Sequence, residues 1–308
     1  MNKKNIFKIV ISLLLIGFLF GYLVDFKKFI NTLASIHVEY LITGILFLVI
    51  SVMISAFRWK YLLSIRNAKI KYITAFNEYL IGMFFNNFLP SSVGGDVSRM
   101  IGATKATGNK VVSVSSVIVE RMVGLVALLI LGICGIIFMD ILNDTLFIYL
   151  ALLLLASAMG AFIVLINKRT NQKITVFVEK LFKRKFTFLS DFRDYSSVSW
   201  KLLNVLLISF VFRIVEGFFV YFIILSIGID LSYLYAIVFF ATIGIIKMVP
   251  VAPNGLGLSA VSWVYLLSTV GINAEMSASL DFLIITTSLL VSSSGGIIWM
   301  LKGKKKLQ

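Results

Sequence analysis

The chain has 308 residues, of which 59% are hydrophobic and 14% are charged, against roughly 45–50% and 25% in soluble domains. It carries 29 Lys and Arg residues and 14 Asp and Glu residues, for a formal net charge of +15. These figures exclude a soluble globular protein, a disordered chain and a disulfide-stapled secreted module. They predict an all-α polytopic membrane protein, a single membrane domain over residues 1–308, whose basic loops face anionic lipid rather than nucleic acid.

Histidine and cysteine are too rare for several kinds of chemistry. Cys134 lies in an apolar run and is the single cysteine, while His37 is the single histidine. An internal disulfide, a metal-thiolate cluster and enzymes that need two histidines are therefore not expected. The sequence predicts no cofactor and no metal site.

Apolar runs predict about six full membrane spans in a plasma or inner membrane. The first, residues 9–24, follows lysines and lacks a small-residue cleavage site, which indicates a retained span with a cytoplasmic N-terminus. The second, 40–57, precedes a basic stretch that we expect to be cytoplasmic, with Trp59 at the interface. The remaining runs are 111–138, 145–166, 201–227 and 280–301, and lysines after the last predict a cytoplasmic C-terminus.

The segment 167–200 is the most basic loop of the chain. Apolar residues from Ile174 to Phe182 recur in it at helical spacing. The loop is either a basic amphipathic helix on the inner membrane surface or a solvated helix, and the pattern favours neither.

Two segments, about 72–108 and 231–275, contain all three prolines: Pro90, Pro250 and Pro253. Proline interrupts helices, and glycine pairs lie beside each break. The charges that flank the two segments predict that the first enters the membrane from the cytoplasm and the second from outside. The segments are either ordinary pairs of short spans or re-entrant hairpins of opposite orientation, the pattern of inverted-repeat transporters. In both cases the broken backbone must be buried in protein or line a wet cavity.

Eight charged residues lie at membrane depth, where each unpaired charge costs about 2.5–3.5 kcal/mol. They are Glu78, Asp96, Arg99, Glu120, Arg121, Arg213, Glu216 and Lys247. Arg213 and Glu216 share a helix face at a spacing of three. We expect a cross-helix pair between Glu120 and Arg213, which is either a structural ion pair or part of a polar lining for a charged headgroup.

The first hairpin contains an anion site in outline. Gly94 and Gly95 allow backbone amides to converge ahead of a helix that contains Arg99. Arg99 is then placed to bind a phosphate, and Asp96 to cap the helix or orient Arg99. The alternative is a tight turn without a ligand.

The second hairpin offers Lys247 ahead of Pro250, where it either faces a headgroup or extends to the interface. The candidate substrate-binding residues are Asn87, Ser92, Gly94, Gly95, Asp96, Arg99, Glu120, Arg121, Arg213, Glu216, Lys247, Asn254, Gly255 and Gly257.

These residues resemble the lysylphosphatidylglycerol synthase transmembrane region family, also called flippase-like proteins. The matching stretches are Asn87 to Arg99, Glu120-Arg121 with Gly124, Arg213 with Glu216-Gly217, and Pro253 to Gly257. The family includes the membrane half of the multiple peptide resistance factor, which moves aminoacylated phosphatidylglycerol between leaflets. The resemblance implies a multi-span lipid translocator with two broken hairpins.

The chain departs from that family's pattern in two places. The family's last loop reads Pro-Gly-Gly-Leu-Gly and then a glutamate, whereas here Asn254 replaces the first glycine and Ser259-Ala260 occupies the region of the acid. This departure argues against a carboxylate-dependent step. The soluble aminoacyl-transferase domain is also absent, so we do not expect the chain to synthesise lysyl-lipid by itself.

Three functions follow as hypotheses. The first is a translocator for a phosphate-bearing lipid, namely an aminoacyl phospholipid, a glycolipid or a polyprenyl-linked sugar. The second is a non-catalytic membrane partner of a separate lipid synthase or glycosyltransferase. The third is a membrane enzyme, which the spaced acids Asp140/Asp144 and Asp191/Asp194 support poorly because they lack companion ligands. The first is preferred, with no enzymatic activity; the sequence leaves the oligomeric state open.

Overall fold

The computed structural model describes four long stretches of the chain and isolated positions between them. These are residues 3–88, 94–139, 199–247 and 255–304, with 156, 157, 159, 160, 167, 169, 172, 173, 195 and 252. The elements in this part of the chain are helices. The expected span 145–166 and the basic loop 167–200 fall almost entirely outside the described residues.

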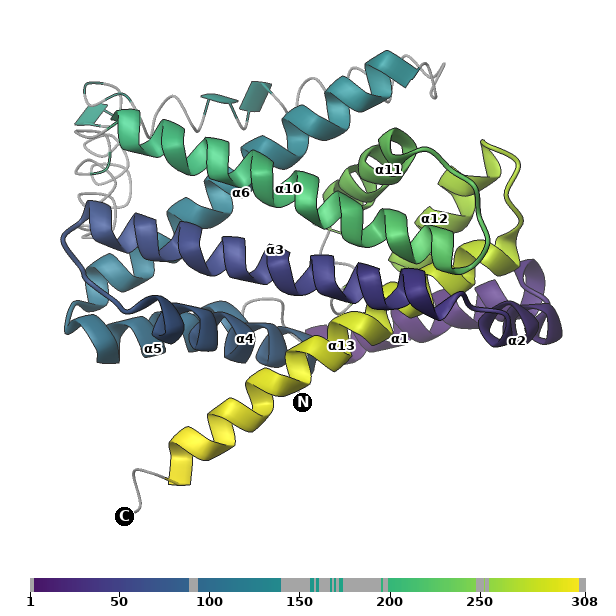
Figure 1. Ribbon diagram of the computed structural model, residues 1–308, viewed down its shortest axis with the longest axis horizontal. Helices are drawn as coiled ribbons and strands as arrows, with labels where there is room; N and C mark the ends of the chain where they lie inside the picture. Colours follow the sequence, from purple (N-terminus) through teal and green to yellow (C-terminus); the bar gives the residue numbers. More distant parts are fainter. Residues whose placement is uncertain are drawn as a thin grey trace.

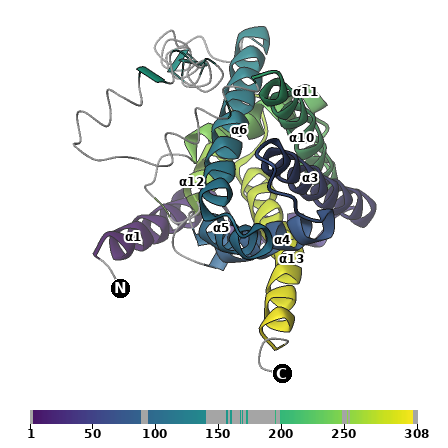
Figure 2. The ribbon, with the colours of Figure 1, turned by 90° about the vertical axis from the view of Figure 1, so that its left-hand side faces the viewer.

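The N-terminal part forms α1 (Lys3–Phe18), a short π-helix (Leu19–Leu23) and α2 (Phe26–Ala34). Asp25 begins α2 by accepting hydrogen bonds from the backbone amides of Lys27 and Lys28 at 2.8 and 3.2 Å. The chain bends by 93° there. The expected first span, residues 9–24, is therefore helical, but it is long and apolar enough to cross a membrane only together with α2. Figure 2, seen from the end where α4 and α5 lie, shows α1 projecting away from the other helices.

The rest of the fold consists of long helices alternating with pairs of short ones (Figure 1). The long helices are α3 (Val38–Ile65), α6 (Lys110–Met139), α10 (Ser199–Ser226) and α13 (Ala274–Lys304). The short pairs are α4 (Tyr72–Phe88) with α5 (Gly94–Thr107), and α11 (Tyr233–Ile246) with α12 (Leu258–Ser268).

The four long helices are long and apolar enough to cross a membrane, and the bent α1–α2 pair makes five in the described residues. They cover the expected runs 40–57, 111–138, 201–227 and 280–301. Large apolar side chains on their outer faces, such as Leu46, Leu207 and Leu290, remain exposed, as lipid contact requires. The protein is thus a multi-pass helical membrane protein; six spans are not reached within the described part.

Helices α3 and α10 form an antiparallel pair. The backbone amide of His37 donates to the carbonyl of Ser226 at 2.8 Å, which joins the start of one to the end of the other. Gly44 lets the helices approach, because a side chain there would meet Ile223. The ring of Phe47 stacks on that of Phe218 with centroids 5.2 Å apart.

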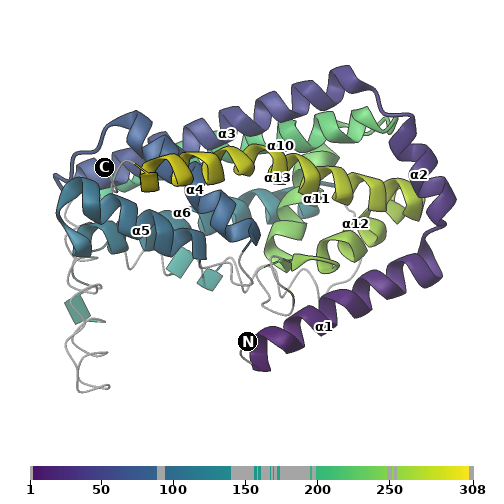
Figure 3. The ribbon, with the colours of Figure 1, turned by 90° about the horizontal axis from the view of Figure 1, so that it is seen from below.

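Each short pair connects two long helices, and the two pairs lie at opposite ends of the molecule (Figure 3). Helices α4 and α5 follow the end of α3, whereas α11 and α12 follow the end of α10. Helix α4 ends at Phe88 and α5 begins at Gly94, while α11 ends at Ile246 and α12 begins at Leu258. The described helices of each pair therefore end and begin on either side of the predicted breaks.

The helices α3–α6 and α10–α13 have matching contacts. Within each set the first short helix packs on the first long helix, and the second short helix on the second long one. Across the sets, α4 packs on α13 and α11 packs on α6. The four helices of one set therefore correspond in order to the four of the other, and each contact has a counterpart. The contact between α3 and α10 is its own counterpart.

Small residues bring the crossing helices close together. A side-chain carbon at Gly295 of α13 would overlap the carbonyl of Leu80 on α4, and one at Gly135 of α6 would overlap Val238 on α11. Helices in lipid associate through such close contacts, since no hydrophobic effect drives them together. The glycines therefore fix how the short pairs sit between the long helices.

Candidate functional site

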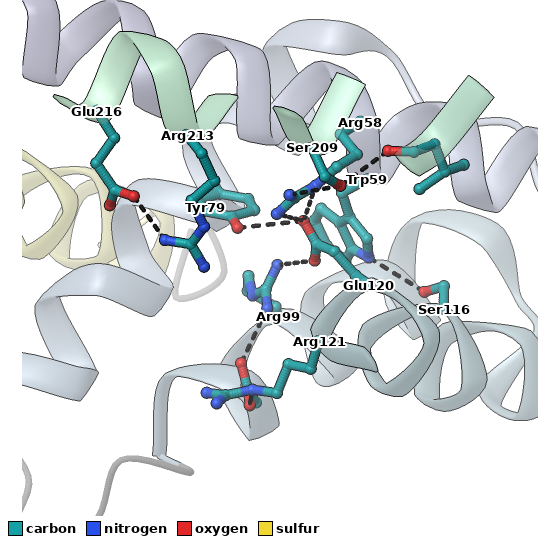
Figure 4. Close-up of polar contacts among 12 residues, drawn as sticks. Arg58, Trp59, Tyr79, Arg99, Ser116, Glu120, Arg121, Ser209, Arg213 and Glu216 are labelled. Carbon is teal, nitrogen blue, oxygen red and sulfur yellow. Dashed lines mark hydrogen bonds and ion pairs between the residues drawn. The ribbon is translucent and has the colours of Figure 1, made fainter. Parts of the chain in front are cut away.

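A carboxylate on α6 is the centre of a buried ionic network (Figure 4). The side chain of Glu120 is 2% exposed. Its Oε1 accepts from Arg58 Nη2 at 3.0 Å and from the hydroxyl of Tyr79 at 3.2 Å. Its Oε2 accepts from Arg99 Nη1 at 2.7 Å. One carboxylate thus joins α3, α4 and α5 to α6.

Arg58 also connects the network to α10. Its Nη1 donates to Ser209 at 3.0 Å, and its guanidinium lies 5.0 Å from the ring centre of Phe212. The expectation that Arg58 lies in a basic stretch after the second span is wrong, because α3 continues past it to Ile65 and buries its side chain. Trp59 is likewise buried rather than interfacial, and its indole N–H donates to Ser116 at 3.1 Å.

Arg99 of α5 is held on every side. Its Nη2 donates to Asp96 Oδ1 at 2.9 Å, and its guanidinium lies 4.4 Å from the ring centre of Tyr79. Asp96 also pairs with Arg121 of α6. Asp96 thereby orients Arg99, as expected, and both terminal nitrogens of Arg99 are bonded to carboxylates rather than presented to a ligand.

The start of α5 lies close against α4. The backbone amide of Gly95 donates to the side-chain carbonyl of Asn86 at 2.8 Å. A side-chain carbon at Gly95 would overlap both Asn86 and the carbonyl of Gly82. A residue without a side chain is therefore required for Asp96 and Arg99 to reach α6.

Arg213 of α10 does not pair with Glu120, so the expected cross-helix pair is wrong. Its Nη1 instead donates to Glu216 Oε2, one turn along the same helix, at 2.6 Å. The two carboxylate oxygens of Glu120 already accept hydrogen bonds from Arg58 and Arg99, so Arg213 lies outside the buried centre. The side chain of Arg213 is 20% exposed, and its buried Nε has no hydrogen-bond partner in the described part of the chain.

These groups line one cavity of about 400 Å³. Four arginines and two carboxylates contribute to its wall, so the lining has a positive charge excess. The charged lining residues are Arg58, Asp96, Arg99, Glu120, Arg121 and Arg213. The side chain of Arg121 is 54% exposed. The cavity thus combines a rigid ionic wall with two arginines at its accessible side.

Sequence reasoning brought together some of the right residues but joined them incorrectly. Asp96, Arg99, Glu120, Arg121 and Arg213 do line one cavity. Asn87 lies apart and donates to Ser292 of α13 at 2.9 Å. Gly94 lines a second hollow, of about 510 Å³, between α4, α5 and the end of α13. Its rim includes the ion pair of Lys302 with Glu78 at 2.8 Å.

The second-hairpin candidates lie at the other end of the fold. Lys247 ends α11 with an exposed side chain, and its alkyl chain lies over Gly255. Gly257 precedes α12 with φ +80°. Predicted site residues Ser92 and Asn254 fall outside the described residues. The twelve candidates that the structure describes therefore belong to two separate regions.

Three polar residues were missed. Arg58 and Tyr79 escaped notice because one follows an apolar run beside other basic residues and the other resembles an interfacial tyrosine. Asp281 of α13 is 4% exposed and accepts from Ser259 of α12 at 3.2 Å. A carboxylate from α13 thus lies beside Ser259, in the region where the sequence lacks the acid of the family pattern. The sequence signal available for Asp281 was that it is a lone acidic residue within an apolar run.

Residues 5–293 match the model of the lysylphosphatidylglycerol synthase TM region. The chain belongs to this family. A UPF0104 membrane protein of Pyrococcus horikoshii is 24% identical, with 91% of this chain and 92% of that protein aligned. A UPF0104 membrane protein of Methanocaldococcus jannaschii is 33% identical over 39% of this chain and 36% of that protein. No solved structure matches. The family membership supports a membrane function related to lipids.

Proposed function

We propose that this member of the lysylphosphatidylglycerol synthase TM family is a lipid translocator without enzymatic activity, which moves a phosphate-bearing lipid between leaflets. The observation that carries the proposal is a positively lined cavity between α4 and α5 and three helices, α3, α6 and α10, that are long and apolar enough to span a membrane. Arginine binds phosphate through charge-assisted, frequently bidentate hydrogen bonds. A charged wall inside a bilayer is costly, and it is typical of substrate or ion pathways.

The arginines divide into two roles. Arg58 and Arg99 are 4% and 6% exposed and saturated by Glu120, Asp96 and Ser209, so they shape the wall. Arg213 has a buried nitrogen without a hydrogen-bond partner among the described residues. The side chain of Arg121 is 54% exposed. Arg213 and Arg121 are therefore the proposed phosphate contacts. The nearby carboxylates of Asp96 and Glu216 suit a headgroup that also carries an amine.

Cavity size argues for a headgroup rather than a whole lipid. A volume of about 400 Å³ is at the low end for ligand pockets. It accommodates a phosphate with a small attached group, while acyl chains remain in the bilayer. Lipid would enter sideways between the helices.

The short helix pairs supply two gates in this proposal. Their breaks at opposite ends, and the matching contacts of the two helix sets, support re-entrant hairpins of opposite orientation. The basic residues Arg66, Lys69, Lys71, Lys105 and Lys302 lie at the α4–α5 end. Because basic residues favour the cytoplasmic side, we infer that this end faces the cytoplasm of the plasma or inner membrane, with both termini on the same side. The arginine cavity would then receive lipid from the inner leaflet.

The test is flipping by the purified protein. Liposomes would contain phosphatidylglycerol with a fluorescent acyl chain, and reduction of the outer-leaflet dye would report the fraction of probe that crosses. We expect Arg213→Gln to slow crossing at least ~10-fold, the equivalent of about 1.4 kcal/mol of lost binding. Arg213→Lys should keep part of the rate, and Lys201→Gln, on the same helix outside the cavity, should match the wild type.

Native mass spectrometry of the same proteins separates the alternatives. A lipid class retained by the wild type and lost in Arg213→Gln supports the cavity as the headgroup site. Specific retention without any flipping would overturn translocation and favour a non-catalytic partner of a lipid-modifying enzyme. Equal retention of bulk lipids by both proteins would overturn the headgroup assignment.

A further inference from the structure

A second buried carboxylate lies at the other hairpin. Asp281 projects from α13 toward the start of α12 and is 4% exposed. Ser259 Oγ donates to its Oδ2 at 3.2 Å. Packed beside the two helices are Leu19, Phe29, Ala260 and Ala278, an apolar cluster that includes the π-helix and α2. The carboxyl group therefore sits in a largely apolar environment.

Asp281 differs from Glu120 in its partners. Glu120 has two guanidinium groups and a phenol within hydrogen-bond distance. Asp281 has no cation within ion-pair distance in the described stretches. The charge acting on it there is that of Lys247. Of the charges on neighbouring elements, Lys28 of α2 pairs with Glu275 in the first turn of α13 at 3.9 Å.

The two carboxylates occupy related positions. Glu120 on α6 is contacted by Arg99 of α5, which lies four residues after Gly95; Asp281 on α13 is contacted by Ser259 of α12, four residues after Gly255. The correspondence of helices described above pairs α5 with α12 and α6 with α13. A cation thus occupies one position and a hydroxyl the other.

An isolated ionised carboxylate is strongly disfavoured in an apolar site, and such a group neutralises or takes up a cation. A metal cation needs several oxygen ligands, whereas the described contacts of Asp281 include one hydroxyl. We propose that Asp281 is a proton-binding site that couples lipid movement to a proton gradient at the end opposite the arginine cavity.

The loop before α12 explains how the proton could change the structure. Gly255 and Gly257 adopt φ of +72° and +80°, so this backbone is not helical. Lys247 lies over Gly255 with an exposed side chain. Loss of the proton leaves a negative charge that attracts the Lys247 ammonium, and with it Gly255, toward α13. Uptake of the proton by Asp281 removes this attraction and releases Lys247. The coupling rests on the proposed function, but the proton site does not.

The proton site is tested by infrared spectroscopy of the full chain in lipid, without any lipid substrate. A difference spectrum between acidic and alkaline buffer should contain a protonated-carboxyl band that Asp281→Asn removes. Asparagine keeps the size of the side chain and can still accept from Ser259. Glu275→Gln should leave the band in place. A wild-type spectrum without an Asp281-dependent band would overturn the proposal, whether or not the protein moves lipid.

Coupling is tested in liposomes that contain the fluorescent phosphatidylglycerol, with the membrane potential held at zero. For one proton per lipid, the steady-state leaflet ratio should shift about tenfold per pH unit of gradient. Asp281→Asn should abolish the shift and Glu275→Gln should preserve it. A wild-type ratio that ignores the pH gradient, or that follows a sodium gradient instead, would overturn proton coupling while leaving translocation intact. No flipping under any gradient would instead defeat the proposed function.

Discussion

Glu120 binds two guanidinium groups that belong to different helices, and both arginine side chains are buried. Removing one member of a buried pair leaves an uncompensated charge, which costs about 3–5 kcal/mol. The single residue therefore governs both local geometry and stability. Two predictions belong to this scale.

Glu120→Gln should destabilise the protein by about 3–5 kcal/mol, because Arg58 and part of Arg99 lose their counter-charge. Thermal unfolding in detergent measures the change. The double variant Arg58→Met with Glu120→Gln should lose less than the sum of the two single changes, since the residues are in direct contact. Additive losses would show that the pair contributes nothing as a unit.

Tyr79→Phe should cost about 1.5–3 kcal/mol, the range for a hydrogen bond to a charged group, while its ring stays beside Arg99. Tyr72→Phe is the matched control on the same helix, because its hydroxyl donates to the carbonyl of Met53 in an exposed position. If the two variants had the same unfolding midpoint, the hydrogen bond from Tyr79 to Glu120 would not stabilise the protein, which would contradict its place in the network.

Among the elements, glycines allow the short helices to approach the long ones closely, and α11 and α12 also bury large apolar side chains such as Phe239 and Trp263. Sequence patterns located α4, α5, α11 and α12, because proline and glycine mark where helices break. The same patterns did not give the pairing of Glu120, since a spacing of three along one helix says nothing about which neighbouring helix supplies the partner. Arg58 was assigned to a loop because helix ends are poorly marked in basic stretches.

Gly295→Ala should destabilise the packing of α4 on α13 by about 1–3 kcal/mol, the range for overpacking a filled contact. The added carbon would overlap the carbonyl of Leu80, and this backbone group cannot easily move away. Gly17→Ala is the control, since no described atom lies within 4 Å of its site. It should be neutral or stabilise by up to about 1 kcal/mol. Equal unfolding midpoints for both variants would argue against close packing at Gly295.

At the scale of the molecule, family membership and the long helices agree with the sequence-based expectation of a multi-pass protein. Composition was sufficient for that conclusion, because lipid imposes long apolar helices. The contact of Asp281 with Ser259 depends on how α12 and α13 pack. A single sequence carries no record of that packing.

Opposite orientation of the two hairpins predicts labelling from opposite sides of the membrane. In a chain with Cys134→Ser, an impermeant thiol reagent should label Ser268→Cys in intact cells, and Lys105→Cys only after the membrane is opened. Both positions are exposed in the fold. Labelling of both from the same side would contradict the arrangement of the hairpins.

The unequal partners of Glu120 and Asp281 have a consequence for the resting protein. Two arginines tie α5 and α3 to α6, whereas one hydroxyl of α12 contacts the carboxylate on α13. Separating the first set breaks buried ion pairs, and separating the second breaks a weaker bond. Two halves with matching contacts therefore have unequal opening energies. We expect the population without substrate to favour the conformer that is open at the α11–α12 end, so that lipid binding at the arginines must supply the free energy for the reverse opening.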